Sequence, residues 1–317
     1  MKRKDFLKLG TAGFAGAALG GVAPYKPEVA EKRHPLHSDN AGLKKGFMLQ
    51  TFPSRENYSL AEQFGMLKAA GFAGVEPESG LNRDEVLEAK HQSGLEIPSV
   101  VVSTHWSYPL SDNDPATRET GVNGVITALH DAKAYGASTI LLVPGIVNAD
   151  VSYDTVYRRS QEQIRSLLPL AEELEITIAI ENVWNRFLLS PLEAARYVDE
   201  LDSPYARWYL DIGNLINYGY PEQWIRILGS RIAMIHIKEF SRQLRDDNGL
   251  WHGFRVNLLE GDNNWPEIMK ALKETGYSGY AIAEPPHKEE GVSPETWLKE
   301  HVSDRMDRIF EHYRPEN

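Results

Sequence analysis

A regular alternation of short apolar runs and amphipathic stretches constrains the fold of this chain more than any other feature of its sequence. The alternation begins near residue 44 and continues almost to the C-terminus. Short apolar runs bounded by Gly, Pro or Asn are typical of buried strands, and apolar residues at helical spacing are typical of helices that pack on a sheet. The expected strands cover 45–52, 72–76, 97–103, 138–143, 176–181, 205–211, 231–238 and 279–284. The expected helices cover 59–70, 82–94, 116–135, 154–175, 191–201, 221–228, 264–276 and 295–312.

Eight strand–helix units predict an α/β protein, and specifically a single (β/α)8 TIM barrel rather than an open doubly wound sheet. No GxGxxG motif follows the first strand, so nothing favours a dinucleotide site. We assign residues 44–317 to one catalytic barrel domain and expect residues 24–43 to form a loose leader. Two expected loops, 104–115 and 239–263, are long enough to be candidates for function.

The first 23 residues differ from the rest of the chain. They read MKRKDFLKLGTAGFAGAALGGVA, with a basic start and a run of small residues, which is the layout of a secretory signal peptide. Residues 3–8 resemble a twin-arginine export signal, except that Lys4 stands where the second arginine is normally found. This pattern predicts export to the periplasm. The alternative is a disordered tail on a cytoplasmic protein.

Composition excludes several classes of function. The formal net charge is −11 and the pI about 5.4, so the chain repels phosphate backbones and we expect no nucleic-acid partner. No apolar run reaches the ~18 residues of a membrane-spanning helix, so we expect no stable membrane anchor. The chain contains no cysteine, which excludes disulfides and thiolate metal sites. A small-molecule partner fits this composition.

Four consecutive expected strands each end in a residue type that binds metals. These residues are Glu181, Asp211, His236 and Glu284. Strand ends in a barrel converge at its C-terminal mouth, where active sites lie. Three carboxylates and one imidazole suit a divalent ion with open coordination positions, Mn²⁺ first, with Mg²⁺, Co²⁺ or Zn²⁺ as alternatives. Any one of the four could instead cap a helix or form a salt bridge, but a cation would resolve the repulsion among three converging carboxylates.

Several residues near these strand ends are candidates for binding a substrate. Lys238 lies two residues after His236, so it faces the same side of the strand and could bind a substrate oxygen. Arg242 and His252 lie in the second long loop. A salt bridge for Lys238 and a solvated surface position for Arg242 are the alternatives.

Three further candidates follow earlier strands. Glu76 ends the second strand and is expected to face the pocket, His105 follows the third strand, and Trp184 follows the fifth. Trp184 would suit the apolar face of a sugar. Each of them could equally be a packing residue.

With these residues in place, the chain resembles the sugar isomerase/epimerase family of xylose-isomerase-like barrels over roughly residues 44–313. The most specific stretches are IEN, YLDIGN, GYPEQWIRILGSRIAMIHIKEF and NLLEGDNNWPEIMKALKETGYSGYAIAE. The chain is most similar to the ketose 3-epimerases, which hold one Mn²⁺ or similar ion. The resemblance implies that the ion is held by Glu181, Asp211, His236 and Glu284. Relatives often pair, so the resemblance also allows a homodimer.

The set of sugar-binding residues departs from the family pattern. The family's substrate-binding arginine falls on Arg242, six residues beyond His236. The family has a histidine where this chain has Asn214, and a glutamate where this chain has Leu188. We therefore expect the metal site to be shared with the family, with Asn214 in the substrate set, and do not infer specificity for ketohexoses.

The resemblance implies an isomerase that removes a proton next to a sugar carbonyl and proceeds through an enediolate. Its catalytic residues would be Glu181 and Glu284, one on each face of the sugar. The alternative is a metal-dependent lyase or hydrolase of 3-keto-glycosides that uses the same site. Export would favour a free ketose or an oxidised glycoside over a sugar phosphate.

Two further functions fit the sequence less well. A non-catalytic sugar-binding barrel would lose the four ligand residues, which this chain keeps. An abasic-site endonuclease would need several more histidines, including one where Asn214 stands.

Overall fold

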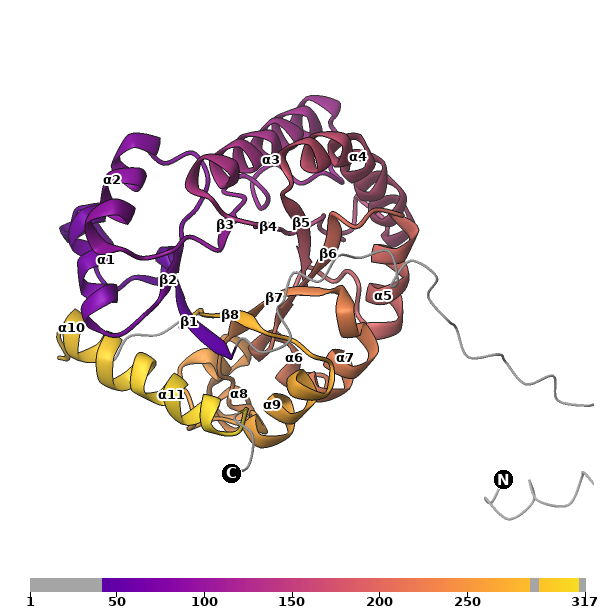
Figure 1. Ribbon diagram of the computed structural model, residues 1–317. Coiled ribbons are helices and arrows are strands. Elements are labelled where there is room, and N and C mark those ends of the chain that lie inside the picture. Colours follow the sequence, from indigo (N-terminus) through magenta and orange to yellow (C-terminus); the bar gives the residue numbers. More distant parts are fainter. Residues whose placement is uncertain (1–41, 286–290, 314–317) are drawn as a thin grey trace, which may run out of the picture.

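The computed structural model of the chain describes residues 42–285 and 291–313. Within these residues, eight parallel strands form one sheet with the order β2-β1-β8-β7-β6-β5-β4-β3. The strands are β1 (Leu43–Met48), β2 (Gly74–Glu76), β3 (Ser99–Val101), β4 (Thr139–Leu142), β5 (Thr177–Glu181), β6 (Ala206–Asp211), β7 (Ile232–Ile237) and β8 (Gly279–Ala283). Figure 1 shows them as an inner ring enclosed by helices, so the predicted TIM barrel is confirmed.

Helices alternate with the strands around the barrel. The outer helices are α1 (Leu60–Ala69), α2 (Arg83–Ser93), α3 (Pro115–Tyr135), α4 (Tyr153–Leu174), α5 (Pro191–Glu200), α7 (Pro221–Leu228), α9 (Trp265–Glu274), α10 (Pro294–Thr296) and α11 (Asp304–Glu311). Local signals set their ends: Ser190 caps α5 by accepting a hydrogen bond from the backbone N–H of Glu193, and Gly94 ends α2 in the left-handed conformation.

The ring closes between β2 and β3 through scattered backbone hydrogen bonds rather than a continuous ladder. The N–H of Val75 donates to the carbonyl of Glu96 over 2.9 Å, and the N–H of Val101 donates to the carbonyl of Pro77 over 2.9 Å. Two isolated parallel bridges lie at the same seam. The barrel is therefore nearly closed, and its first and last strands pair directly as β1 and β8.

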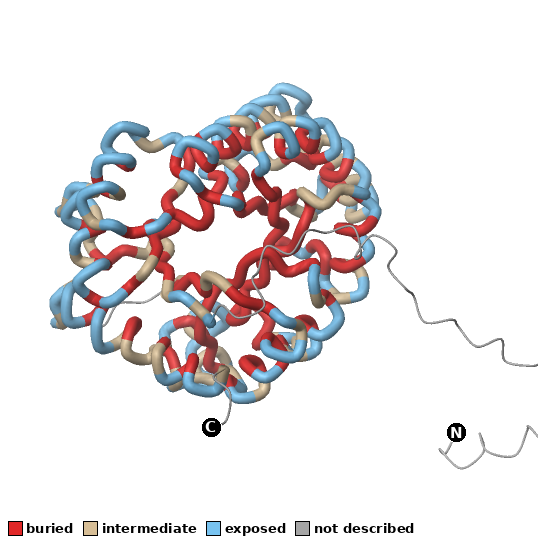
Figure 2. The backbone as a smooth tube through the Cα atoms, in the orientation of Figure 1, coloured by how far each residue is buried: buried red, intermediate tan, exposed pale blue. Residues whose placement is uncertain are grey.

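Alternate residues of each strand point into the barrel, where they form a small apolar cluster. It comprises Val101, Leu141, Ala179, Tyr209, Ala233, Met234 and Ile282. The space is tight, since a Cβ added to Gly46 would lie 2.3 Å from Cδ1 of Ile282. The opposite faces of the strands pack under the helices, and Figure 2 shows burial concentrated on the strands and the inner sides of the helices. This alternation decides which strand-end residues point into the mouth.

The loops after β6 and β7 contain helices that the sequence did not predict. α6 (Gly213–Ile216) follows β6, and the long loop after β7 folds into α8 (Arg242–Asn248) and a 3₁₀ turn over Leu250–Phe254. β1 begins at Leu43, two residues earlier than expected. Among the described helices, none is long and apolar enough to cross a membrane. The expected signal peptide and nearly all of the expected leader lie outside the described residues, so they stay predictions.

Candidate metal centre

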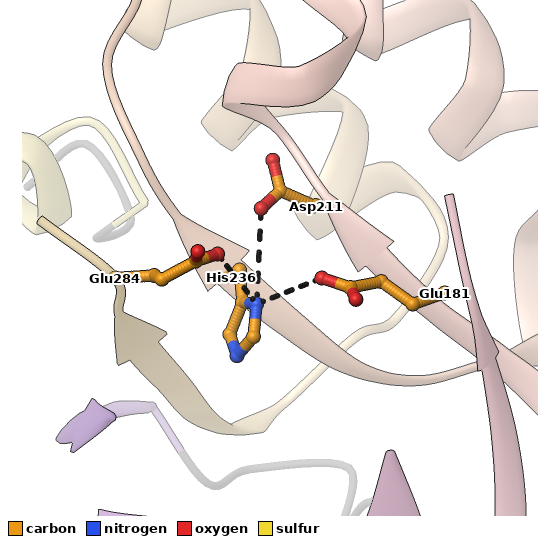
Figure 3. A group of neighbouring side chains, drawn as sticks. All are labelled: Glu181, Asp211, His236 and Glu284. Carbon is orange, nitrogen blue, oxygen red and sulfur yellow. Dashed lines mark hydrogen bonds and ion pairs between the residues drawn. The ribbon is translucent and has the colours of Figure 1, made fainter. Parts of the chain in front are cut away.

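Neighbouring strands bring the four expected ligand residues to one point. Glu181 ends β5, Asp211 ends β6, and His236 is the register partner of Asp211 on β7. Glu284 follows β8 and extends its ladder, since its N–H donates to the carbonyl of Ile237 over 3.1 Å. Figure 3 shows the three carboxylates converging on one ring nitrogen of His236. The convergence follows from the parallel order of the strands and the inward direction of these side chains.

The distances within this group are short. One ligand atom of each of the four residues lies within 4.8 Å of the others. Nδ1 of His236 lies 3.1 Å from Oε1 of Glu181, 3.1 Å from Oε2 of Glu284 and 3.7 Å from Oδ2 of Asp211. Three carboxylates this close repel one another unless a cation stands between them.

One oxygen of this group tests directly whether a cation fits. Oδ1 of Asp211 accepts a hydrogen bond from the backbone N–H of Asn214 over 2.6 Å, whereas Oδ2 is buried without a hydrogen bond. A buried carboxylate oxygen without a hydrogen bond is costly, and a metal ion would remove that cost. Carboxylate oxygens with one imidazole nitrogen are the donor set of Mn²⁺, Mg²⁺ or Co²⁺, so the residues present fit such an ion.

Burial and neighbouring charges pull the carboxyl groups in different directions. Burial raises the pKa of Glu181 to about 7 and also raises the pKa of Asp211. Burial acts to raise the pKa of Glu284 too, but the positive charge of Lys238 and the hydrogen bond from His236 bring it below its usual value. Lys238 Nζ lies 2.8 Å from Oε1 of Glu284 and 3.5 Å from Oδ2 of Asp211. Burial and neighbouring positive charges therefore shift the pKa values of these carboxyl groups in opposite directions, as is typical of functional sites.

Glu76 contacts the ring nitrogen of His236 that does not face the other three carboxylates, and it does not line the cavity as the sequence predicted. Its side chain is fully buried, and Nε2 of His236 lies 2.9 Å from its Oε2. Its other oxygen accepts hydrogen bonds from the hydroxyls of Tyr209, over 2.6 Å, and Ser99. This arrangement leaves Nδ1 of His236 for a metal and fixes the orientation of the ring, as carboxylate partners of metal-binding histidines do.

We expect Glu76→Gln to weaken Mn²⁺ binding about 10- to 100-fold, because an amide holds the imidazole less firmly than a carboxylate does. Isothermal titration of metal-stripped protein with Mn²⁺ measures the effect. Glu96→Gln is a matched control, since the Glu96 side chain is largely exposed and pairs with Lys90 far from the centre. An unchanged Mn²⁺ affinity in Glu76→Gln would show that Glu76 does not orient His236.

A cavity of about 630 Å³ opens above the ligand group. Of the predicted substrate-binding residues, the cavity is lined by His105, Trp184, Asn214 and Lys238. His105 is buried, which lowers its pKa to about 3, and its Nδ1 accepts a hydrogen bond from the N–H of Val143 over 3.2 Å. His105 is therefore a neutral imidazole whose Nε2–H can donate to a substrate hydroxyl.

Arg242 and His252 are not among the lining residues, contrary to expectation. Arg242 turns away because its Nε donates to the carbonyl of Ile216 over 3.1 Å and its guanidinium lies 3.7 Å from Asp262. The cavity is also lined by Trp106, which directly follows His105, and by residues that sequence reasoning missed, namely Gln50, Trp251, Phe254 and Arg255. The long loop after β7 supplies part of the lining, and its fold into α8 and a 3₁₀ turn decides which of its side chains face inward.

The sequence matches a known family and several characterised proteins. The model of the family described as xylose isomerase-like TIM barrel matches residues 64–306. L-ribulose-5-phosphate 3-epimerase UlaE of Escherichia coli is 25% identical over 194 residues, which cover 61% of this chain and 66% of that protein. The enzyme of the same name from Salmonella paratyphi A is 26% identical over 200 residues, which cover 63% of this chain and 68% of the relative. The match to the first relative thus spans slightly less than two thirds of its length.

Solved structures share the fold over most of the chain. D-psicose 3-epimerase, crystallised in the presence of D-fructose, superimposes with a TM-score of 0.71 at 18% identity and covers 86% of this chain and 99% of its own. The 3-keto-D-glucoside 4-epimerase YcjR from E. coli superimposes with a TM-score of 0.69 at 18% identity and covers 84% of this chain and 98% of its own. At this level of identity the likeness establishes the barrel fold.

Proposed function

The chain belongs to the xylose isomerase-like TIM barrel family, and from that membership we propose that it is a sugar epimerase or isomerase that depends on a divalent metal ion. The observation that carries the proposal is the group of Glu181, Asp211, His236 and Glu284 at the mouth of the barrel. The relatives named L-ribulose-5-phosphate 3-epimerase support the reaction class. The cavity is lined by aromatic side chains and by polar groups such as His105 and Asn214, a combination that supports a small sugar as substrate.

The proposed ligands are one carboxylate oxygen each from Glu181, Asp211 and Glu284, and Nδ1 of His236. A divalent ion held by these residues would polarise the carbonyl and neighbouring hydroxyl oxygens of a sugar, and so would acidify the C–H bond of the carbon next to the carbonyl. Mn²⁺ is the ion we favour, because oxygen donors with one imidazole suit it.

We assign the proton transfer to Glu181 and Glu284. They come from β5 and β8, on either side of the β6–β7 pair, and Figure 3 shows them on opposite sides of His236. One carboxylate takes the proton from the carbon next to the carbonyl, and the electron pair of that C–H bond enters an enediolate. The other, in its acid form, returns a proton to the opposite face of the same carbon. The carbon then has the inverted configuration, which is epimerisation.

Other residues of the cavity would hold the sugar. Lys238 points at Glu284 and Asp211 from the floor of the cavity and can donate a hydrogen bond to a developing oxyanion. His105 and Asn214 offer neutral hydrogen-bonding groups from β3 and β6 sides of the mouth. Neutral groups suit hydroxyls, so we assign the orientation of the sugar ring to these two residues. The charged residues would act at the reacting carbons.

The proposal is tested by incubating the Mn²⁺-loaded protein in D₂O with a panel of sugars. The panel holds free ketoses, L-ribulose 5-phosphate and a 3-keto-glucoside, and proton NMR is recorded after the metal is removed with a chelator. We expect deuterium next to the carbonyl of at least one sugar, together with its epimer or aldose. Release of the aglycone from the 3-keto-glucoside without exchange in any ketose would show elimination instead. Absence of exchange in every sugar would contradict the proposal.

A further inference from the structure

We propose that the cavity contains a second subsite, an aromatic wall that binds a ring attached to the reacting sugar. The substrate class that follows is a sugar ketone with a second six-membered ring joined through a glycosidic bond. The aromatic wall is formed by Phe254, Trp184 and Trp251. The inference rests on the proposed function, which supplies the reaction at the metal centre. The binding of the second ring is argued from the geometry of the aromatic wall alone.

The aromatic wall leads from the metal centre to solvent. Lys238 Nζ, which contacts Glu284, lies 4.9 Å from the centroid of the Phe254 ring. Phe254 is 6% exposed, and its ring centroid lies 4.8 Å from that of Trp184. The Trp184 centroid lies 4.9 Å from that of Trp251, which is 68% exposed. A sugar whose carbonyl reaches the metal centre would therefore place any substituent directed outward against this wall.

Two rings of the aromatic wall, those of Trp184 and Phe254, are held in place before any ligand arrives. Nε1–H of Trp184 donates to the carbonyl of Asn214 over 2.9 Å, and the ring packs edge-on against Phe240 at 5.7 Å. The turn that carries Phe254 is tied down because the N–H of Ser241 donates to the carbonyl of Gly253 over 2.7 Å. A Cβ on Gly253 would lie 2.3 Å from the Phe240 ring, so glycine is required for this close packing. Preorganised rings lose little conformational entropy on binding.

A further tryptophan faces the cavity from across the barrel. Trp106 follows β3, which lies opposite β7 in the ring of eight strands, and it is 50% exposed. Its ring packs edge-on against His105 at 5.6 Å, so it too has a fixed neighbour. Large aromatic side chains exposed on both sides of a cavity with a polar floor are typical of ligand-binding surfaces.

The size and charge of the cavity favour an uncharged second ring. Its volume of about 630 Å³ lies well inside the ~300–1,000 Å³ range of pockets that bury drug-sized ligands, which leaves room beyond one sugar ring. The apolar face of a pyranose matches an indole ring. Among the described residues that line the cavity, the cations are Lys238 and Arg255, and Lys238 lies beside Glu284 at the metal centre, where the reacting end of the sugar would bind. A phosphate would therefore depend on Arg255 at the exposed rim.

Affinity measurements with two ketoses test the subsite. Isothermal titration of the Mn²⁺-saturated protein compares D-fructose with isomaltulose, in which a glucose ring is attached to fructose. We expect isomaltulose to bind about tenfold more tightly, the gain of one ring stacked on tryptophan. Trp251→Ala should remove that difference and leave the affinity for D-fructose unchanged. Tyr220→Ala is the matched control, because Tyr220 is an exposed aromatic residue that does not line the cavity.

Four results would overturn the subsite. Equal affinities for the two sugars would do so, as would a Trp251→Ala variant that weakens both equally. If the protein bound fructose 6-phosphate more tightly than isomaltulose, and Arg255→Ala removed that preference, the outer part of the cavity would be a phosphate site. If Trp251→Ala changed the elution volume in size-exclusion chromatography but left the affinities for both sugars unchanged, Trp251 would belong to an interface between chains. The deuterium exchange assay is independent of these results, so the subsite can fail while the proposed function stands.

Discussion

Glu284→Gln is expected to lower the rate of deuterium exchange into a sugar substrate by about 10²- to 10⁴-fold, the usual range for removing a general acid or base. A glutamine can neither accept nor return the proton, and it is also a poorer metal ligand than a carboxylate. The assay is therefore run at Mn²⁺ concentrations above the measured Kd of the variant, so that a loss of metal does not account for the loss of turnover.

The matched control for this variant is again Glu96→Gln, which makes the same change in a largely exposed side chain. We expect it to keep the wild-type exchange rate. The assignment of Glu284 fails if Glu284→Gln, loaded with metal, retains more than about a tenth of the wild-type rate.

The second large effect is on stability. Arg231 lies just before β7, at the end of the barrel opposite the cavity, and its side chain is 6% exposed. Its Nη2 lies 2.6 Å from Oδ2 of Asp199, which is 5% exposed, and its Nε donates to Oδ1 of Asp199 over 2.8 Å. Arg231→Met removes the two short guanidinium contacts of a buried carboxylate, so we expect the free energy of unfolding to fall by about 3 kcal/mol. Urea denaturation followed by circular dichroism measures the change.

Two comparisons separate burial from charge in this prediction. Arg226→Met also removes an arginine with two carboxylate contacts, one to Glu267 and one to Glu274, but the Arg226 side chain is 38% exposed, so the loss should stay within about 1 kcal/mol. The double variant Asp199→Leu with Arg231→Met should recover much of the stability lost in Arg231→Met, because both charges are then absent. Equal destabilisation by Arg231→Met and Arg226→Met would refute the argument from burial.

The order of strands and helices could be predicted from the sequence because each unit carries its own local signals. The run TIAIE is expected to be a strand and is β5, and Ser190 before Pro191 marks the start of α5. The ligand group followed from two general facts, the convergence of strand ends in a barrel and the alternation of side chains along a strand. Neither fact needs knowledge of the loops.

The set of residues that line the cavity was harder to predict because it depends on packing that local sequence does not encode. Glu76 ends a strand as Glu181 does, yet its side chain is fully buried against His236 and does not line the cavity. Arg242 and Arg255 lie in the same long loop, and only the fold of that loop into α8 and a 3₁₀ turn directs Arg255, not Arg242, to the cavity.

The account depends most on a bound divalent ion that makes proton exchange next to a sugar carbonyl possible. The most direct test is to measure deuterium exchange with metal-stripped protein, before and after adding one equivalent of Mn²⁺ per chain, using the sugar of the panel that exchanges fastest. The account predicts no exchange above background without metal and recovery of the full rate with it. Exchange at an undiminished rate in the stripped protein would contradict it.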